Sequence, residues 1–534
     1  MRNFYYTFRL RSVICLSVIL LLMFVSFTRV LTVTNEAYKT TSDNNIVKVE
    51  INNARGNFYD CNGYKLTGGQ KRYATVFLPT KQSVIRFCQV TDGREKELGL
   101  KNLKQNKPVV IYKTQKISGN GIYSFETSER YNDEIYLGQL IGYTDSNERG
   151  VYGLEKAFDE VLYSNKANTV SFDLNALGQY LTGAKPCTVN NPSSGAVYLT
   201  IDKEIQKICA SASKKLTKGA VVVTETATGK IRALLSKPTL SVNDLASAVN
   251  NANSPFLNRA VCAYSVGSVF KPIVAAAMLE NNKGDFCYTC NGFCKILGIT
   301  FYCNNKNGHG NLTLENGLSL SCNTYFYNAA AAVKANSLYN LAVAFGFNNS
   351  VDFANGIKTA KGSLTSLEQL KKSKANIANF AIGQGNIALS PVVLSNLYTA
   401  IANDGKYISP TVIEGYVKNG KYEKNIGGDT NAVISKATAQ VLKNYLVNAV
   451  NNGTGKSAKP DIGGAGGKTA TAQTGQYKNG KEILNAWFCG FFPEDKPKYT
   501  VVVLAEDAIS GGSDAAPIFK EIADKMYEKG FIDE

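Results

Sequence analysis

An uncharged apolar run near the N-terminus, residues 12–28, constrains the fold of this chain more than any other feature. Its 17 residues would span about 25 Å as an α-helix, the short end of what a membrane crossing requires. Arg11 and Arg29 flank the run, and no acidic residue occurs among the first eleven. This charge asymmetry predicts a cytoplasmic tail at 1–11, a cell-membrane anchor at 12–28 and an extracytoplasmic remainder. A cleaved signal peptide is the alternative, but no small-x-small cleavage site closely follows Thr28, which favours an uncleaved anchor.

Composition limits the functions open to the rest of the chain. The 534 residues are enough for more than one domain, and 44% of them are hydrophobic, which allows large packed cores. The net charge of +17 comes from scattered Lys and Arg residues without an Arg-rich stripe, so we expect no nucleic-acid partner. The single histidine, His309, excludes a site with two His ligands, and a Ser-His-Asp triad would have to use it.

The distribution of β-like and helical segments predicts two domains after the anchor. Short β-like runs separated by turns occupy residues 45–190, and a polar, turn-rich stretch at 190–195 marks the boundary. The second domain, 195–534, has two β-like runs early and three late, with helical segments between them. This order is typical of an α/β protein of the α+β type, in which one antiparallel sheet is packed by helices. The five runs are 219–224, 231–235, 468–473, 484–492 and 499–506.

The first chemical signal lies where a long apolar helix is predicted to begin. Ser268 would lie in the first turn of this helix and Lys271 three residues later, on the same face. A serine hydroxyl is a poor nucleophile until a base takes its proton. A lysine can be that base if burial and the positive end of a helix lower its pKa. The Ser-x-x-Lys spacing alone is a weak signal, because a capping serine followed by a surface lysine has the same pattern.

Two further motifs follow along the chain. Ser321-Cys322-Asn323 could present a hydroxyl and an amide to a cleft. The stretch 466–471, with the sequence GGKTAT, places a lysine on a β-like run before threonines that can bind a carboxylate, and its glycines permit close approach of a substrate backbone. A phosphate-binding loop would require Gly at position 462, where this chain has Ile. The three motifs in this order are far more specific together than any one alone.

Longer stretches resemble the class B penicillin-binding proteins, the monofunctional D,D-transpeptidases of peptidoglycan. Residues 55–60, RGNFYD, resemble the opening of the non-catalytic pedestal domain of that family, and 153–155, GLE, resemble its next landmark. One departure concerns Ala470, because the family usually has Lys-Thr-Gly-Thr where this chain has Lys-Thr-Ala-Thr. We expect the added methyl group to preserve activity and to change substrate or antibiotic fit. The stretches that resemble the transpeptidase domain are 199–202, 219–238, 257–259, 264–272, 487–491 and 497–499.

The resemblance implies acyl transfer through a serine. Ser268 would attack the stem peptide, Lys271 would act as the base, and Ser321 and Asn323 would relay a proton and hold the substrate. The remaining site residues that it implies are Lys468, which adds positive potential, and the substrate-binding residues Gly467, Thr469 and Thr471.

The resemblance also implies partners and leaves alternatives. Peptidoglycan stem peptides would be substrates, β-lactam antibiotics would be inhibitors, and a multi-span membrane glycosyltransferase of the cell-wall machinery would be a partner. No metal and no cofactor is expected. A β-lactamase-like hydrolase shares the three motifs, and a non-enzymatic scaffold of a cell-wall synthesis complex would keep the fold without reacting with penicillin.

Four of the 12 cysteines gather in one segment, at Cys287, Cys290, Cys294 and Cys303, and His309 follows. Cys-x-x-Cys with two further cysteines is consistent with zinc, but the second pair is spaced by nine residues instead of three. Family members often carry a Cys pair at the places of Cys290 and Cys303, and disulfides persist outside the membrane. We therefore favour a Cys290–Cys303 disulfide, leave the other two cysteines undecided and read His309 as structural.

Overall fold

The computed structural model describes residues 2–164, 166–191, 195–425, 427–428 and 430–532. Residues 192–194 of the predicted boundary stretch lie outside the described residues. The chain forms two compact units, each assembled from three stretches. The first comprises Met1–Ala54, Lys71–Ser128 and Asn165–Pro192, and the second comprises Arg55–Gln70, Glu129–Ser164 and Ser193–Glu534.

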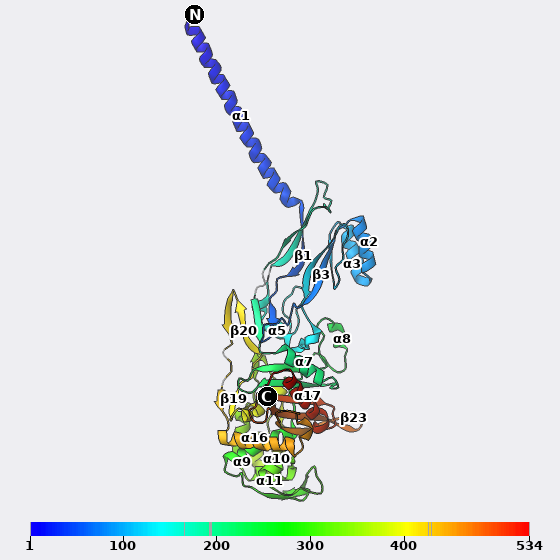
Figure 1. The fold of residues 1–534 in the computed structure, drawn as a ribbon, viewed down its shortest axis with the longest axis vertical. Coiled ribbons are helices and arrows are strands. Elements are labelled where there is room, and N and C mark those ends of the chain that lie inside the picture. The colour runs from blue at the N-terminus through cyan, green and yellow to red at the C-terminus, as the bar shows by residue number, and fades with distance from the viewer. Residues whose placement is uncertain (1, 165, 192–194, 426, 429, 533–534) are drawn as a thin grey trace. The chain divides into compact units, whose positions relative to one another are not determined.

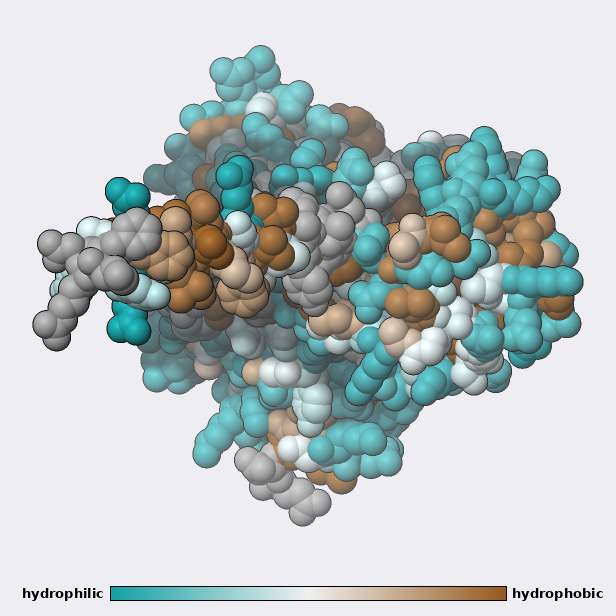
Figure 2. All heavy atoms as spheres, turned by 90° about the horizontal axis from the view of Figure 1, so that it is seen from above, coloured by the Kyte–Doolittle hydropathy of each residue, from teal (hydrophilic) through white to brown (hydrophobic). Residues whose placement is uncertain are grey.

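A long N-terminal helix, α1 (Arg2–Asn44), carries the apolar run (Figure 1). Within it, Tyr5–Thr34 has a mean hydropathy of 2.5 and is long and apolar enough to cross a membrane; among the described residues it is the one helix of that kind. Its apolar side chains are exposed all round the helix and form the brown run in the foreground of Figure 2. Exposed apolar side chains on every side of a helix suit a lipid surrounding rather than water.

The rest of the first unit is rich in β-structure, as the sequence predicts. One sheet has the order β1 (Ile46–Asn53), β6 (Ala167–Asp173), β7 (Cys187–Val189), and a second has the order β4 (Val109–Lys113), β3 (Gln70–Phe77), β5 (Ile122–Glu129). Two helices, α2 (Lys81–Val90) and α3 (Gly93–Lys104), accompany the second sheet. Phe87 of α2 packs edge-on against Phe77 of β3, which ties the helices to the sheet.

A five-stranded antiparallel sheet organises the second unit. Its order is β10 (Ile231–Lys237), β9 (Gly219–Glu225), β25 (Tyr499–Glu506), β24 (Lys481–Phe492), β23 (Gly466–Lys478). Every pairing in it is antiparallel. The predicted combination of two early strands with three late ones in one sheet is therefore confirmed. Because β23 lies at the edge, one side of its backbone is not paired within this sheet.

Helices cover both faces of this sheet. On one face, α7 (Lys203–Ala212) and α17 (Ala516–Glu528) bury apolar side chains against alternate residues of the strands. On the other face lie four helices, of which α9 and α15 are buried along most of their length. These four are α9 (Lys271–Glu280), α11 (Asn323–Ala331), α15 (Pro391–Ala402) and α16 (Lys436–Asn451).

A smaller sheet and several short elements complete the second unit. The smaller sheet has the order β2 (Asn57–Tyr59), β8 (Gly195–Leu199), β20 (Ile413–Lys418), β21 (Lys421–Lys424). The short helices and helical turns are η1 (Asp133–Ile135), α4 (Gly138–Ile141), α5 (Gly153–Ala157), α6 (Asp159–Leu162), α8 (Leu245–Val249), η2 (Gly267–Phe270), α10 (Leu314–Ser319), α12 (Ala335–Ala344), α13 (Leu367–Lys372), α14 (Lys374–Ala381), η3 (Lys456–Ala458) and η4 (Gly511–Ala515). The short strands are β11 (Tyr264–Ser265), β12 (Tyr288–Cys290), β13 (Phe293–Ile296), β14 (Ile299–Tyr302), β15 (Gly310–Leu312), β16 (Asp352–Ala354), β17 (Ile357–Lys358), β18 (Ala388–Leu389), β19 (Lys406–Ile408) and β22 (Thr430–Ala432).

A buried ion-pair network joins the two N-terminal stretches of the second unit. The carboxylate of Glu155, in α5, is fully buried and lies 2.7 Å from Nη2 of Arg55 and 2.6 Å from Nε of Arg130. Nη1 of Arg55 also lies 2.7 Å from Oδ1 of Asp159. The RGNFYD and GLE stretches of the sequence are therefore in contact in the folded chain, since Arg55 belongs to the first and Glu155 to the second.

We expect Glu155→Gln to lower the free energy of unfolding by about 3 to 5 kcal/mol, because it leaves two guanidinium groups buried without their shared carboxylate. The change can be followed in denaturant by the fluorescence of Trp487, the single tryptophan, which is fully buried in β24. Glu204→Gln is the matched control, since Glu204 forms an exposed pair with Lys207, and we expect it to change stability by less than about 1 kcal/mol. Equal effects of the two substitutions would contradict a structural role for the network.

Candidate active site

Ser268 lies in a tight helical turn, η2, that leads directly into α9. The side chain is partly exposed, whereas Gly267 and Val269 on either side are buried. Gly267 has φ +62°, a conformation that favours glycine, and its N–H donates to the carbonyl of Gly383 at 3.0 Å. The backbone is fixed on both sides of the serine, since the hydroxyl of Tyr398 also donates to the carbonyl of Val269 at 2.9 Å.

Two side chains brace the segment that precedes this turn. Nε1 of Trp487 donates a hydrogen bond to the carbonyl of Ser265 at 2.9 Å. The hydroxyl of Tyr264 donates to Oε1 of Glu506 at 2.7 Å, and the same oxygen accepts from Nε of the buried Arg259 at 2.7 Å. Strands β24 and β25 of the central sheet thus set the position of the turn.

Lys271 is the first residue of α9 and is completely buried. Its Nζ donates to the carbonyl of Ser321 at 2.7 Å, to Oγ of Ser321 at 3.2 Å and to Oδ1 of Asn323 at 2.7 Å. Burial disfavours the ammonium form and lowers the pKa of Lys271 to about 7. A substantial share of this lysine is therefore a neutral amine near neutral pH, which is the form a general base requires.

Ser321 lies in the sharp turn between α10 and α11, and Asn323 is the first residue of α11. Ser321 has φ +55°, which is uncommon for a residue other than glycine. Between them, Cys322 caps α11: its sulfur accepts from the N–H of Tyr325 at 3.4 Å. The strained turn therefore places three hydrogen-bond acceptors around the Lys271 amine. Ser321 and Asn323 contribute these acceptors jointly, although Cys322 separates them in the sequence.

Lys468 extends from β23 into the same buried region. It is fully buried, and its Nζ contacts Oγ1 of Thr454 at 3.3 Å and the carbonyl of Thr469 at 3.0 Å. Burial, and after it the positive charge of Lys271, hold the pKa of Lys468 well below its usual range. The two lysines are therefore electrostatic neighbours, and the positive charge of Lys271 disfavours the ammonium form of Lys468.

Thr454 is a site residue that the sequence did not reveal. Its Oγ1 lies 2.9 Å from Oγ1 of Thr469, and its N–H donates to the carbonyl of Ser319 at 3.1 Å. A Cβ on the preceding residue, Gly453, would come within 2.2 Å of that carbonyl, so the backbone can pass there only as glycine. The sequence feature that could have indicated Thr454 is its position between two glycines just after α16.

The other residues of the β23 motif, Gly467, Ala470 and Thr471, have different surroundings. A Cβ on Gly467 would lie 2.5 Å from the ring of Phe488, so the packing of the sheet itself demands glycine there. Ala470 is buried, and its methyl carbon lies 3.6 Å from where a Cβ on Gly267 would stand, which places the methyl group against the serine turn. Thr471 is exposed, and its Oγ1 accepts from the N–H of Gly511 at 3.3 Å.

A compact group of three cysteines and the one histidine lies beside the Ser321–Asn323 turn. The sulfurs of Cys290, Cys303 and Cys322 and a ring nitrogen of His309 all lie within 4.8 Å of one another. Cys290 and Cys303 are free thiols in the structure, in place of the expected disulfide between them. Cys322 joins the group because α11 begins at this point, a proximity that the spacing in the sequence does not show. This donor set could hold a metal ion.

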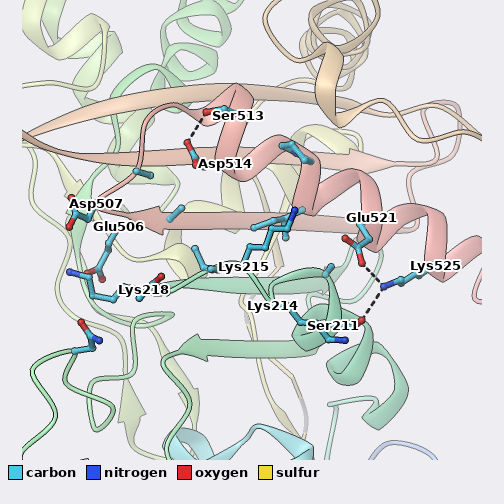
Figure 3. Close-up of a pocket in the computed structure, with 18 of the residues that line it drawn as sticks. Ser211, Lys214, Lys215, Lys218, Glu506, Asp507, Ser513, Asp514, Glu521 and Lys525 are labelled. Atoms are coloured by element: carbon cyan, nitrogen blue, oxygen red, sulfur yellow. Dashed lines mark hydrogen bonds and ion pairs between the residues drawn. The ribbon is translucent and has the colours of Figure 1, made fainter.

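A cavity of the second unit lies away from these residues. It has a volume of about 730 Å³ and is lined by three lysines that follow α7 and by charged residues of β25, α17 and neighbouring segments (Figure 3). Lys525 is paired there with Glu521 and contacts Ser211. None of the predicted site residues is among its lining residues. A second ion pair of its lining joins Lys478 and Asp507.

Comparison with known proteins identifies a family for most of the second unit. The family described as penicillin binding protein transpeptidase domain matches residues 219–524. The chain is similar to the peptidoglycan D,D-transpeptidase MrdA of Acinetobacter baumannii, with 26% identity over 420 residues, which cover 72% of this chain and 61% of the relative. It is also similar to stage V sporulation protein D of Bacillus subtilis, with 28% identity over 523 residues, which cover 89% of this chain and 78% of that protein. The match thus spans about three fifths of the length of the MrdA relative.

Solved structures share the fold. The penicillin-binding protein PBP2 of Helicobacter pylori, in complex with MreC, has a TM-score of 0.67 and 21% identity, covering 91% of this chain and 99% of that one. The penicillin-binding protein 3 of Mycobacterium tuberculosis, complexed with ampicillin, has a TM-score of 0.65 and 20% identity, covering 90% of this chain and 96% of that one. At these identities the likeness establishes the fold, including the helix-packed sheet and the β-rich N-terminal part.

The lowered pKa of Lys271 makes a prediction about stability. In the unfolded chain a lysine has a pKa of about 10.4, so between pH 7 and that value the unfolded state binds more protons than the folded state, and stability rises with pH. We expect wild-type protein to gain about 3 kcal/mol from this group between pH 7 and pH 9.5. Lys271→Met should lack that gain.

Unfolding in denaturant at the two pH values, followed by Trp487 fluorescence, measures the difference. Lys283→Met is the control, because Lys283 is exposed and the variant should keep the pH dependence of the wild type. If Lys271→Met kept the full rise as well, Lys271 would not be the group that titrates.

Proposed function

Because the chain belongs to the penicillin-binding protein transpeptidase family, we propose that it is a peptidoglycan D,D-transpeptidase that works through an acyl-serine intermediate. The observation that carries this proposal is the buried amine of Lys271, held by Ser321 and Asn323 and placed one helical turn after Ser268. A base kept partly neutral by burial beside a partly exposed serine is what nucleophilic acyl transfer requires.

We propose the following use of these groups. The hydroxyl of Ser268 attacks the carbonyl of the penultimate D-Ala of a stem peptide, and its proton passes to Lys271. The bond to the last D-Ala breaks, and Ser321 relays a proton to the departing amine. An amine from a neighbouring peptidoglycan strand then attacks the acyl-serine, loses its proton to the base and releases Ser268. Asn323 holds Lys271 and the substrate in position during both steps.

The strand β23 would bind the substrate. As an edge strand it can pair with an extended peptide, and Lys468 and Thr469 offer a positive centre and a hydroxyl to the terminal carboxylate. Thr471, exposed two residues further on, would contact the same carboxylate. Backbone N–H groups of Ser268 and Thr471 would form the oxyanion hole, and each such donor typically contributes about 3 kcal/mol. Gly467 would serve binding indirectly, by letting β23 lie close on Phe488.

The cellular location that we propose depends on the apolar run near the N-terminus. We propose that residues 12–28 cross the cell membrane once with 1–11 in the cytoplasm, that 45–190 form a pedestal, and that 195–534 act on peptidoglycan outside. β-Lactams would acylate Ser268 as mimics of the D-Ala-D-Ala terminus, and ampicillin is bound in the structure of the similar M. tuberculosis protein. A multi-span membrane glycosyltransferase would supply the strands to be cross-linked. The H. pylori relative was solved with MreC, so a scaffold of that kind is a further partner to test.

We expect one covalent penicillin adduct on the wild-type protein and none on Ser268→Ala. Intact-mass spectrometry after brief exposure to a fluorescent penicillin detects the adduct, and a chase shows how long it lasts. Trp487 fluorescence confirms that the variant is folded. An equal adduct on both proteins would refute the assignment of Ser268. Rapid loss of the adduct would favour a hydrolase, and no labelling of folded wild-type protein would favour a scaffold.

The rate of acylation should rise with pH and level off above about 7, because Lys271 must be neutral to accept the serine proton. Well below that pH, each unit should slow labelling about tenfold. Lys271→Ala should abolish labelling while the protein stays folded, and Lys283→Ala should keep both the rate and the profile. A flat profile in the wild type between pH 5.5 and 8.5 would exclude Lys271 as the base.

A further inference from the structure

We propose that Cys290, Cys303, Cys322 and His309 bind one zinc ion, which fastens the segment 287–312 to the Ser321–Asn323 turn. The ion would be structural, because four protein ligands close a tetrahedral site and leave no position for a substrate. The metal site is inferred from the geometry of its four donor atoms alone. The effect of the metal on acylation, in contrast, rests on the proposed function.

Three of the six distances between the donor atoms match a tetrahedral zinc site, and all six are within 4.8 Å. Zinc lies about 2.3 Å from sulfur and about 2.0 Å from nitrogen, which sets the edges of the tetrahedron near 3.8 Å between sulfurs and about 3.5 Å between sulfur and nitrogen. In the structure the sulfurs of Cys303 and Cys322 are 3.7 Å apart. Nδ1 of His309 lies 3.6 Å from the sulfur of Cys290 and 3.5 Å from that of Cys303. The four donors therefore surround a space of the size that one zinc ion fills.

A disulfide accounts for this arrangement less well. It would join two sulfurs at about 2.05 Å and leave the third sulfur and the imidazole without a role. Nδ1 of His309 instead faces two different sulfurs at nearly equal distances, and Cys322 lies beside Cys303. All three cysteines are buried and His309 is partly so, which shields the site from solvent. Three thiolates with one imidazole are a common ligand set of structural zinc.

The backbone around the ligands is shaped to bring them together. The N–H of Cys303 donates to the carbonyl of Gly292 at 2.8 Å, and the N–H of His309 donates to the carbonyl of Cys290 at 3.0 Å. Gly308 has φ +81°, and a Cβ there would come within 2.2 Å of the Cys290 carbonyl. Glycine is therefore required directly before His309 for the imidazole to reach the sulfurs. The N–H of Tyr325 donates to the sulfur of Cys322, as the outer partner of a metal-bound thiolate would.

The ion would act on the active site through the backbone of Cys322. The two neighbours of that residue, Ser321 and Asn323, supply all three acceptors of Lys271. Nδ2 of Asn323 also donates to Oδ1 of Asn304, the residue that follows Cys303, at 3.2 Å. Both sides of the turn are thus attached to ligands of one metal site. Zinc would hold Ser321 in its uncommon backbone conformation and so make Lys271 a positioned base.

The test measures metal content in the full chain, purified in detergent without chelator. We expect one zinc per chain by mass spectrometry of the metal, and three additional titratable thiols in the folded protein after a chelator removes it. Cobalt(II) added to the stripped protein should give thiolate charge-transfer bands typical of tetrahedral sulfur coordination. Zinc-free wild-type protein with a Cys290–Cys303 disulfide, found by peptide mapping, would overturn the site.

Matched variants identify the ligands. Cys290→Ser and His309→Ala should lose the zinc, whereas His309→Cys should keep it, because a fourth thiolate can replace the imidazole. Cys287→Ser is the control: Cys287 is exposed in the same segment, lies outside the cluster, and its loss should leave one zinc per chain. Full zinc occupancy in Cys290→Ser would refute the ligand set. The measurements on wild-type protein remain decisive if a ligand variant fails to fold.

The link to the active site is tested by penicillin acylation before and after zinc removal. We expect at least about tenfold slower acylation of stripped protein, and recovery when zinc is restored. An unchanged rate would overturn the link while leaving the metal site intact. If the zinc-loaded protein were never acylated, the proposed function would fail, and the zinc content and thiol count would still decide the metal site.

Discussion

The contact on which the candidate active site depends is the one between the Lys271 amine and the turn at Ser321–Asn323. An amine inside a protein core is unfavourable as a cation, and three oxygen acceptors compensate for part of that cost. The remaining penalty appears as the lowered pKa. Lys271 is buried together with most of α9, because α11, α12 and α16 pack around that helix.

The central sheet serves two purposes through the alternation of its side chains. On one face of β23, Gly467 lies against Phe488, which packs on Phe519 of α17. On the other face, Lys468 and Ala470 face the layer that contains the serine turn and α9. A shift of one residue in the pairing of β23 with β24 would exchange these faces and remove Lys468 from the site. Lys468 therefore lies in the candidate site only if β23 and β24 pair in this register.

The sequence predicted those parts of the structure that depend on local pattern. The five strands, their division into an early pair and a late trio, and the apolar N-terminal helix follow from periodicity and composition. The three motifs follow from residue types at short spacing. Contacts between distant residues were not accessible in this way: Thr454 reaches Lys468 through a loop after α16, and Asn304 meets Asn323 only in the folded chain. Cys322 was read as the filler of a Ser-x-Asn motif, and its side chain instead points into the cysteine cluster.

The closeness of the two buried lysines gives the substrate a part in the chemistry. Lys468 contacts the hydroxyl of Thr454 and the carbonyl of Thr469, both uncharged, and Lys271 further disfavours its ammonium form. A terminal carboxylate bound beside Lys468 would supply the missing negative charge and raise the pKa of that lysine. Once Lys468 is charged, it repels a proton from Lys271, because the interaction between two titrating groups is mutual. In the proposed reaction, a substrate with an anionic end would thus help to keep Lys271 neutral when Ser268 gives up its proton, whereas a peptide without that end would not.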